Sequence, residues 1–322
     1  MRKIITIAES VLDTEYTHGQ PQRTFVGGRI PCAAASLAQA GAATFMVSEC
    51  TADCVGDIII DYLSRHNVDT TSIDRYPDGA TAFSAIFRQD DGTSRIVNYG
   101  QYPEDRFNVI WPRIDKDDIV IIGSLYSVDL PQRERLFELV SYAAERKAII
   151  IYLPGFQHGI NFRITRVMPN ILENLEVADI VIAQQQDIDA IFPGENDGEA
   201  YRNHIEFYCD NYLHITPRLD VKRYGARQCR QHSGPGARDN MLGWQAGFTA
   251  GIVYGLIAQG VTHETLPALD GGTWDAMIAE AMQWAEASTG PDNCVDAEFA
   301  SSRTAALLAA LENYDKTQEN KL

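Results

Sequence analysis

The sequence predicts a doubly wound α/β fold: a three-layer α/β/α sandwich with a mostly parallel sheet and a small β-appendage. Short apolar runs alternate with amphipathic stretches from Lys3 to about Gln185. This βαβ rhythm is typical of a parallel sheet with helices on both faces. Two segments interrupt the rhythm and predict the appendage, and helical periodicity alone follows Gly243.

The elements of the sandwich follow from these runs. The predicted strands are Lys3–Ala8, Thr44–Ser48, Asp118–Gly123, Ala148–Leu153 and Asp179–Ala183. Amphipathic stretches between them predict helices over Cys32–Ala40, Val55–His66 and Pro131–Lys147, one through Ile171 and one from about Gln185. After Gly243 we expect helices over Trp244–Gln259, Thr273–Ser288 and Ser301–Asn313.

The appendage is predicted from the two interrupting segments. Thr14–Phe25 is polar and irregular, whereas Ala80–Phe87 and Ser94–Tyr99 alternate around Asp90-Asp91-Gly92 as a hairpin does. We therefore expect one domain over residues 1–315, an appendage from about 14–26 and 79–104, and a disordered polar tail over 316–322.

Composition limits the function classes. With 322 residues and 45% hydrophobic content, the chain can bury a large core. A formal net charge of −17 without a long basic run makes nucleic acid and anionic membrane surfaces poor partners. No apolar run approaches the roughly 18 residues of a membrane span, and Glu9 interrupts the N-terminal run. We expect a cytoplasmic protein.

The six cysteines predict reduced thiols and no metal site. They are scattered, none forms a Cys-x-x-Cys pair, and a chain of this size needs no disulfide staples. Cys50 and Cys54, or Cys209 with its neighbouring histidines, lack a complete ligand set at usual metal-site spacing.

Several motifs occur in an order that carries a resemblance. Gly27-Gly28-Arg29-Ile30-Pro31-Cys32 opens a helix of small residues, then come Thr51-Ala52-Asp53-Cys54-Val55-Gly56-Asp57 and Asn67-Val68-Asp69-Thr70. In that order they resemble the N-terminal signature of the PfkB, or ribokinase-like, carbohydrate kinases. The resemblance extends from Ile4 to about Phe299 and implies a ribokinase-like fold whose β-lid closes over a sugar.

The resemblance also implies substrate-binding positions. The family begins with Gly-Glu-x-x-x-Asp, which here reads Ala8-Glu9-Ser10-Val11-Leu12-Asp13, so Asp13 takes the place of the sugar-contacting aspartate. Gly27, Gly28 and Cys32 follow, with Cys32 where the family has Asn. Taken alone, Gly27-Gly28 is equally a tight turn and Asp13 a solvated turn carboxylate.

The phosphoryl-transfer segment departs from the family. That chemistry needs an anion-binding helix N-terminus and a base near the acceptor hydroxyl. The family supplies both in Asp-Thr-x-Gly-Ala-Gly-Asp-x-Phe, whereas this chain reads Asn240-Met241-Leu242-Gly243-Trp244-Gln245-Ala246-Gly247-Phe248. The base position is therefore Ala246, and Gly243, Trp244 and Gln245 form a degenerate anion hole in which side chains should obstruct the phosphate.

The nucleotide and magnesium region is altered as well. Gln184-Gln185-Gln186-Asp187 stands where the family has the Asn-x-x-Glu motif that organises Mg²⁺ and phosphate. Asn293 lies in a loop that in relatives is near the nucleotide or a monovalent cation, although a helix-ending turn is an equal interpretation. ATP and Mg²⁺ are the expected cofactors if the protein is active.

Three functions remain open. The first is a pseudokinase that binds a small sugar-like ligand or a partner, because a lost base alone lowers a rate roughly 10²–10⁴-fold. The second is an active sugar kinase that uses a displaced acid, Asp239 or Asp187. The third is a structural dimer with an empty site. In all three we expect a homodimer through the β-lid, whose alternating strands cannot bury both faces in a small appendage.

Overall fold

The large sheet has nine strands, and most of them are parallel. The computed structural model describes residues 2–90, 94–156, 163–225, 228–236 and 240–319. The strand order is β13-β12-β11-β10-β9-β8-β1-β4-β5, with parallel pairing from β11 to β5 and antiparallel pairing of β12 and β13 at one edge. The bounds are β1 Ile4–Ile7, β4 Thr44–Thr51, β5 Ile73–Tyr76, β8 Ile119–Gly123, β9 Ile149–Leu153, β10 Ile180–Gln184, β11 Tyr212–Ile215, β12 Val221–Gly225 and β13 Gln228–His232.

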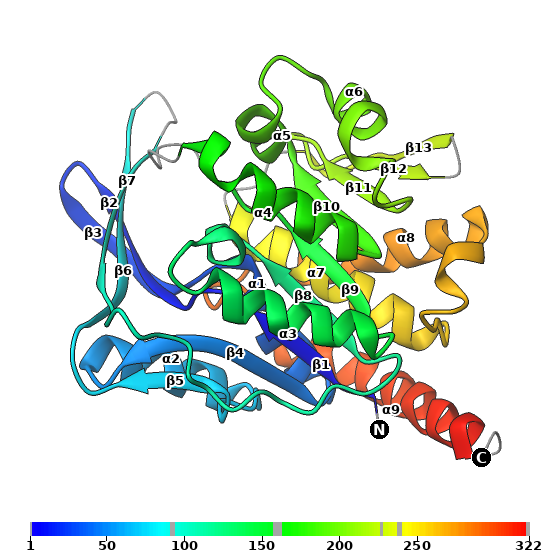
Figure 1. Cartoon of the computed structure of the whole chain (residues 1–322), viewed down its shortest axis with the longest axis horizontal. Helices are drawn as coiled ribbons and strands as arrows, with labels where there is room; N and C mark the ends of the chain where they lie inside the picture. Colours follow the sequence, from blue (N-terminus) through cyan, green and yellow to red (C-terminus); the bar gives the residue numbers. More distant parts are fainter. Residues whose placement is uncertain (1, 91–93, 157–162, 226–227, 237–239, 320–322) are drawn as a thin grey trace.

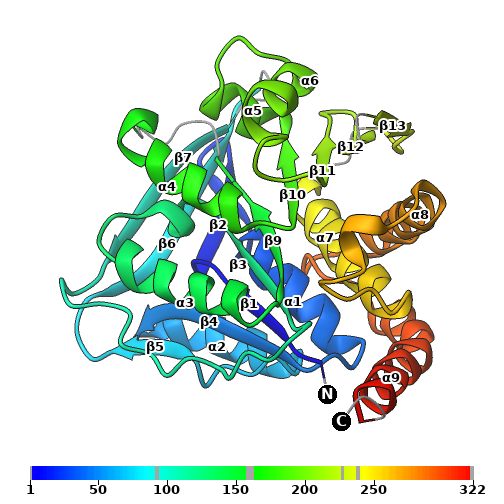
Figure 2. The same ribbon diagram turned by 45° about the vertical axis from the view of Figure 1, so that its right-hand side comes forward.

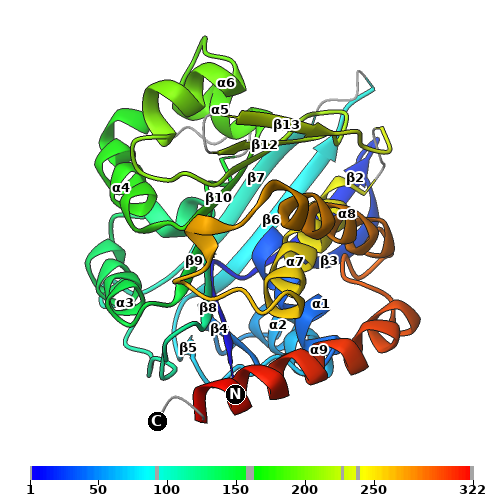
Figure 3. The same ribbon diagram turned by 90° about the vertical axis from the view of Figure 1, so that its right-hand side faces the viewer.

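Helices cover both faces of this sheet, as Figures 1 and 3 show. Successive residues of β8 belong to opposite cores: Ile119 and Ile121 to one hydrophobic cluster, Val120 and Ile122 to the other. The first face carries α1 Arg29–Gln39, α2 Cys54–Arg65, α7 Met241–Ala258, α8 Gly271–Ala287 and α9 Ala297–Glu319; the second carries α3 Arg133–Glu145, α4 Ile164–Val177, α5 Gln185–Ile191 and α6 Asp197–Ala200. Short helical turns are η1 Leu125–Val128, η2 Tyr201–Ile205 and η3 Leu266–Ala268. The predicted three-layer sandwich is confirmed.

A separate four-stranded sheet, called the small sheet from here on, stands beside the large one (Figure 1). Its order is β3-β2-β6-β7, with bounds β2 Val11–Thr17, β3 Gln20–Gly27, β6 Ala80–Arg88 and β7 Ser94–Gln101. The hairpin of β6 and β7 follows the prediction. The segment Thr14–Phe25, which is irregular in sequence and is predicted to belong to the appendage, lies in the β2–β3 hairpin, where Asp13 pairs with Phe25 and Thr14 with Thr24.

Asp53 connects the small sheet to the large one. Its carboxylate accepts the Gly56 N–H at 2.8 Å, which caps α2, and the Thr51 hydroxyl at 2.6 Å. It also accepts the Thr81 N–H and hydroxyl of β6, each at 2.8 Å. A Cβ at Gly56 would lie 2.2 Å from the Thr51 carbonyl oxygen, so only glycine fits there. The Thr51–Gly56 motif therefore anchors β6 at the end of β4.

The C-terminal helix extends further than the sequence predicts. α9 packs against α1 and α7 and continues to Glu319 (Figure 2), so residues 316–319 of the expected tail are helical. Tyr314 explains the extension, because its hydroxyl donates to Asp117 Oδ2 at 2.9 Å and its ring lies under the Arg2 guanidinium. Residues 320–322 lie outside the described part of the chain.

The most apolar helix is an interior one. α7 is long and apolar enough to cross a membrane by length and composition alone, yet 78% of it is buried inside the fold. It packs against α1 on one side and α8 on the other. A core helix of a globular fold has this composition.

Candidate functional site

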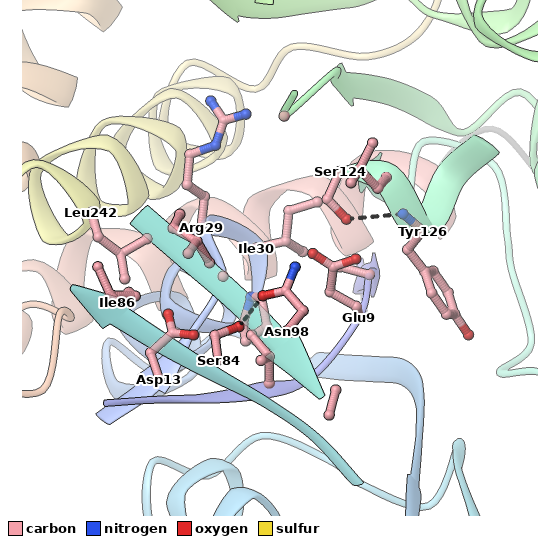
Figure 4. Close-up of a pocket in the computed structure, with 18 of the residues that line it drawn as sticks. Glu9, Asp13, Arg29, Ile30, Ser84, Ile86, Asn98, Ser124, Tyr126 and Leu242 are labelled. Carbon is pink, nitrogen blue, oxygen red and sulfur yellow. Dashed lines mark hydrogen bonds between the residues drawn. The ribbon is translucent and has the colours of Figure 1, made fainter. Parts of the chain in front are cut away.

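A cavity of about 1030 Å³ lies between the small sheet and the carboxyl ends of the large-sheet strands. Glu9 follows β1, Ser124 follows β8 and Gly155 follows β9, and all three line it. The first turns of α1 and α7 complete the wall (Figure 4). Ligands of open α/β sheets bind at this edge, so the cavity is the candidate functional site.

Two carboxylates face the cavity near the small sheet. Asp13 of β2 is 9% exposed, and Glu9 precedes it on the segment that leaves β1. Ser84 of β6 donates to Asn98 Oδ1 of β7 at 2.7 Å, and both side chains line the same part of the cavity (Figure 4). The four residues form a set of acceptors and donors suited to hydroxyl groups.

Burial raises the pKa of both carboxyl groups. For Asp13 burial raises the pKa to about 7, with the Glu9 and Glu15 charges adding to it and Ser84 and Arg23 opposing it. For Glu9 burial also raises the pKa to about 7, with Asp129 and Glu49 adding and Ser124 opposing. Neither carboxylate forms an ion pair with a described residue. Near neutral pH, each therefore changes charge readily.

The glycine pair shapes this end of the cavity, and Cys32 does not reach it. A Cβ at Gly27 would lie 2.1 Å from Asp13 Oδ2, so glycine leaves the space that the Asp13 side chain occupies. Gly28 lines the cavity and caps α1 with a φ of 88°. Cys32 is fully buried among apolar residues, and its thiol lies 3.5 Å from the Val26 carbonyl oxygen.

The first turn of α7 differs from the arrangement expected at the anion hole. Asn240 caps the helix by accepting the Gly243 N–H at 3.2 Å, so Gly243 already lies inside the helix. Gln245 lines the cavity together with Asn240, Met241 and Leu242. Ala246 is fully buried in the apolar core and does not line the cavity.

Trp244 does not obstruct the cavity, contrary to the expectation from the sequence. Its side chain is fully buried, its indole N–H donates to Glu286 Oε1 at 2.9 Å, and its ring stacks on Phe248 at 5.6 Å. The cavity wall at this helix comes from Met241, Leu242 and Gln245 instead. The carboxylate suggested as a replacement, Asp239, lies outside the described residues.

Asn293 stabilises the α7 cap from behind. The Asn240 amide donates to Asn293 Oδ1 at 2.8 Å and contacts the carbonyl oxygens of Gly290 at 2.9 Å and Thr289 at 3.1 Å. Asn293 is fully buried and does not line the cavity. Asn293 therefore holds the Asn240 side chain that caps α7.

The Gln184–Asp187 turn separates into a wall residue and a buried acid. Gln184 lines the cavity at the end of β10. Asp187 is fully buried, and its two oxygens accept the N–H groups of Phe156 at 2.7 Å and Gln184 at 2.8 Å. Burial raises the pKa of Asp187, and the Arg29 charge and these hydrogen bonds oppose the shift. Gln184 is therefore the N-cap of α5, and Asp187 is the third helical residue, whose carboxylate closes the capping box.

The described residues offer no complete set of protein ligands for a metal ion. Among the described residues, no three His, Cys, Asp or Glu side chains gather as ligands. Mg²⁺ prefers oxygen ligands in octahedral geometry, and Asp187 is fully buried and does not line the cavity. The six cysteines are unpaired, and Cys50 is buried while Cys54 is exposed.

Several cavity residues were not identified from the sequence. Arg29 extends from the first turn of α1, and Glu49 binds Arg106 and accepts the Tyr76 hydroxyl at 3.0 Å. The buried Tyr126 hydroxyl has no hydrogen-bond partner among the described residues. Only Glu9 and Arg29 stand within motifs; the others are single residues brought together by the fold.

Comparison with known proteins agrees with this architecture. Residues 2–206, more than half of the chain, match the sequence model of the pfkB family carbohydrate kinases. The chain therefore belongs to that family. No curated protein sequence matches it.

Solved structures of low sequence identity share the whole fold. Aminoimidazole riboside kinase from Salmonella enterica, in complex with aminoimidazole riboside and an ATP analog, is 13% identical with a TM-score of 0.77, covering 94% of this chain and 100% of that one. Fructokinase from Xylella fastidiosa with bound ATP is 18% identical with a TM-score of 0.74, covering 97% and 100%. An uncharacterized sugar kinase from Pyrococcus horikoshii is 16% identical with a TM-score of 0.73, covering 95% and 99%. These likenesses confirm the ribokinase-like fold.

Proposed function

We propose that this chain binds a sugar-like, polyhydroxyl ligand at Asp13 and is a pseudokinase, without phosphoryl transfer at the rates of an ordinary kinase. Glu9, Asp13, Ser84 and Asn98 offer hydroxyl groups several hydrogen-bond partners, and two of these residues, Asp13 and Ser84, are buried. The similar structures of a riboside kinase and of fructokinases support a ligand of this class. The small sheet, placed over the cavity, acts as the β-lid.

The burial of Ala246 is the observation that carries the second half of the proposal. The position where the family resemblance expects the base lies in the apolar core and not at the cavity. From Asn240 to Gln245 the chain has no acid, and Asp239, which directly precedes the Asn240 cap, lies outside the described residues. Loss of a positioned base lowers a rate roughly 10²–10⁴-fold.

A second candidate function is an active kinase with a displaced base. Asp187 is unsuited to that role, because it is fully buried and both oxygens accept backbone N–H groups. Glu9 and Asp13 favour the candidate, since their pKa values of about 7 are what a general base needs near neutral pH. ATP would then enter by the end of the cavity lined by Gln184, Thr216 and Pro217.

The test is a sugar and nucleoside panel applied to the purified full-length protein. Melting-temperature shifts report binding, and a coupled assay with ATP and Mg²⁺ reports turnover. We expect at least one panel member to stabilise the wild type but not Asp13→Asn, with no turnover. Turnover above about 1 s⁻¹ that is lost in Glu9→Gln or Asp239→Ala would establish the second candidate instead. If no panel member stabilises the protein, the remaining hypothesis is a structural dimer with an empty site.

A cytoplasmic location and a homodimer belong to the same proposal. The six cysteines are all unpaired, as is usual in a reducing compartment. The outer strand of the small sheet, β7, exposes Val97 and Tyr99 by 40% and 60%. A two-fold axis through this sheet would cover both side chains.

A further inference from the structure

Arg29 is a buried cation without a hydrogen-bonded partner. It is the first residue of α1, lines the cavity, and has a side chain only 10% exposed. No described residue accepts a hydrogen bond from its guanidinium, and its nearest acid oxygen, Asp187 Oδ2, lies 3.8 Å away. Figure 4 shows its side chain extending away from Asp13 and Glu9.

Asp187 does not satisfy this guanidinium. Both of its oxygens accept backbone N–H groups at shorter distances, 2.7 and 2.8 Å. A guanidinium has five N–H donors in a fixed fork and stays protonated in proteins. Burying it without hydrogen bonds costs free energy that an anionic ligand would recover. The charge of Asp187 therefore attracts the Arg29 guanidinium to this position, while the N–H groups of the guanidinium remain without an acceptor among the described residues.

The other cavity arginines are already occupied. Arg23 donates to Glu15 at 2.9 Å, and Arg88 donates to the same carboxylate at 2.6 Å. Arg106 binds Glu49. Among the four arginines that line the described cavity, Arg29 alone has no hydrogen-bonded carboxylate.

The surroundings of Arg29 leave room for a ligand group. Gly155 lines the cavity with a φ of +70°, and a Cβ there would lie 3.1 Å from Arg29 Nη2. Met241 and Leu242, in the first turn of the 18-residue helix α7, line the same cavity. Helix N-termini favour anions through their free N–H groups and dipole. The guanidinium and this helix end provide positive potential in one cavity.

We propose that Arg29 is the anion-recognition residue of the cavity, that it binds a phosphate group directly, and that it does so without a divalent metal. A guanidinium fork matches two phosphate oxygens. The phosphate belongs either to a nucleotide or to a sugar phosphate that spans the cavity from Arg29 to Asp13. The sugar-phosphate alternative rests on the proposed function, a sugar-like ligand at Asp13. The assignment of Arg29 as a phosphate-binding residue does not depend on it.

The experiment measures binding of four probes to the full-length protein by calorimetry: inorganic phosphate, ATP, a hexose 6-phosphate and the free hexose. Each titration is run in EDTA and again in Mg²⁺. We expect a phosphate-bearing probe to bind equally well in both, and Arg29→Gln to weaken it at least about tenfold, the usual range for a charged hydrogen bond. Arg113→Gln, an 84% exposed arginine that does not line the cavity, is the matched control.

Three results would overturn the assignment: unchanged phosphate affinity in Arg29→Gln, no binding of any phosphate-bearing probe to the wild type, or binding that requires Mg²⁺. Binding of ATP alone identifies the nucleotide source, and binding of the hexose phosphate alone identifies the sugar phosphate. If Arg29→Gln does not fold, Arg29→Lys is measured in its place. Lysine keeps the positive charge beside Asp187 but lacks the two-pronged guanidinium, so we expect phosphate affinity to fall about threefold or more. An unchanged phosphate affinity in Arg29→Lys contradicts the proposal. The free hexose separately tests the Asp13 site.

Discussion

Replacing Asp13 by Asn should stabilise the protein at alkaline pH while removing ligand binding. The folded protein raises the pKa of this carboxyl from its ordinary value of 3.8 to about 7, chiefly through burial. A carboxyl group with a raised folded-state pKa destabilises the fold once the unfolded state ionises, from about pH 4 upward, and the penalty stops growing near pH 7. The uncharged, isosteric amide carries no such penalty.

The magnitude follows from the same shift. Between pH 5 and pH 8 the penalty grows over about two pH units, from 5 to the folded-state pKa, at about 1.4 kcal/mol per unit, or about 3 kcal/mol. Glu9 repels Asp13 and shares in the titration, so we expect about 1–3 kcal/mol. Asp13→Asn should therefore gain that much free energy of unfolding over the wild type on going from pH 5 to pH 8.

Urea unfolding at the two pH values measures this difference. Other buried carboxyl groups titrate in both proteins, so only the difference between variant and wild type is compared at each pH. Asp61→Asn, which removes an exposed carboxylate on α2, serves as the matched control. An Asp13→Asn variant with the same relative stability at pH 5 and pH 8 would refute the account of Asp13 as a buried, unpaired acid.

Three further predictions follow from the geometry. Gly27→Ala, whose Cβ would lie 2.1 Å from the Asp13 carboxylate, should weaken ligand binding as strongly as Asp13→Asn, whereas Gly198→Ala, with contacts of 3.4 Å, should not; calorimetry compares them. Ala246→Asp should lower the melting temperature without producing turnover in the coupled assay, because a carboxylate there is buried in the apolar core and costs several kcal/mol; a stable, active variant would contradict this. Light scattering at micromolar concentration should show a dimer that Tyr99→Glu dissociates, and a monomeric wild type would count against the interface.

The sandwich could be predicted because its strands are buried on both faces. β8 and β9 are continuous apolar runs with every residue buried, so their composition alone identifies them. The strands whose bounds the sequence did not predict lack this signal. β3 exposes four of its eight residues, and β13 reads Gln228-Cys229-Arg230-Gln231-His232 with four of five exposed. Their pairing comes from the neighbouring strand, which a local pattern does not contain.

The candidate site was predictable only where a motif fixes the backbone. Asp13 and Gly27 belong together because the glycine leaves space for the carboxylate, and the resemblance identified both. Arg29 stands inside a motif, yet its role depends on the distance to Asp187, about 160 residues further along the chain. The Glu49–Arg106 pair is likewise assembled by tertiary structure alone.

The first turn of α7 shows how a glycine can serve helix packing. In the sequence, Gly243 matches a glycine that would let a phosphate approach the backbone. In the structure Asn240 caps the helix three residues earlier, and a Cβ at Gly243 would lie 2.1 Å from the Ser288 carbonyl oxygen. Gly247 and Gly251 meet α8 equally closely, at 2.3 Å from Ser288 Oγ and 2.4 Å from Ala281 Cα. Glycine at 243 therefore serves the close packing of α7 on α8, and this packing, together with the earlier helix start, directs position 246 into the core rather than to the cavity.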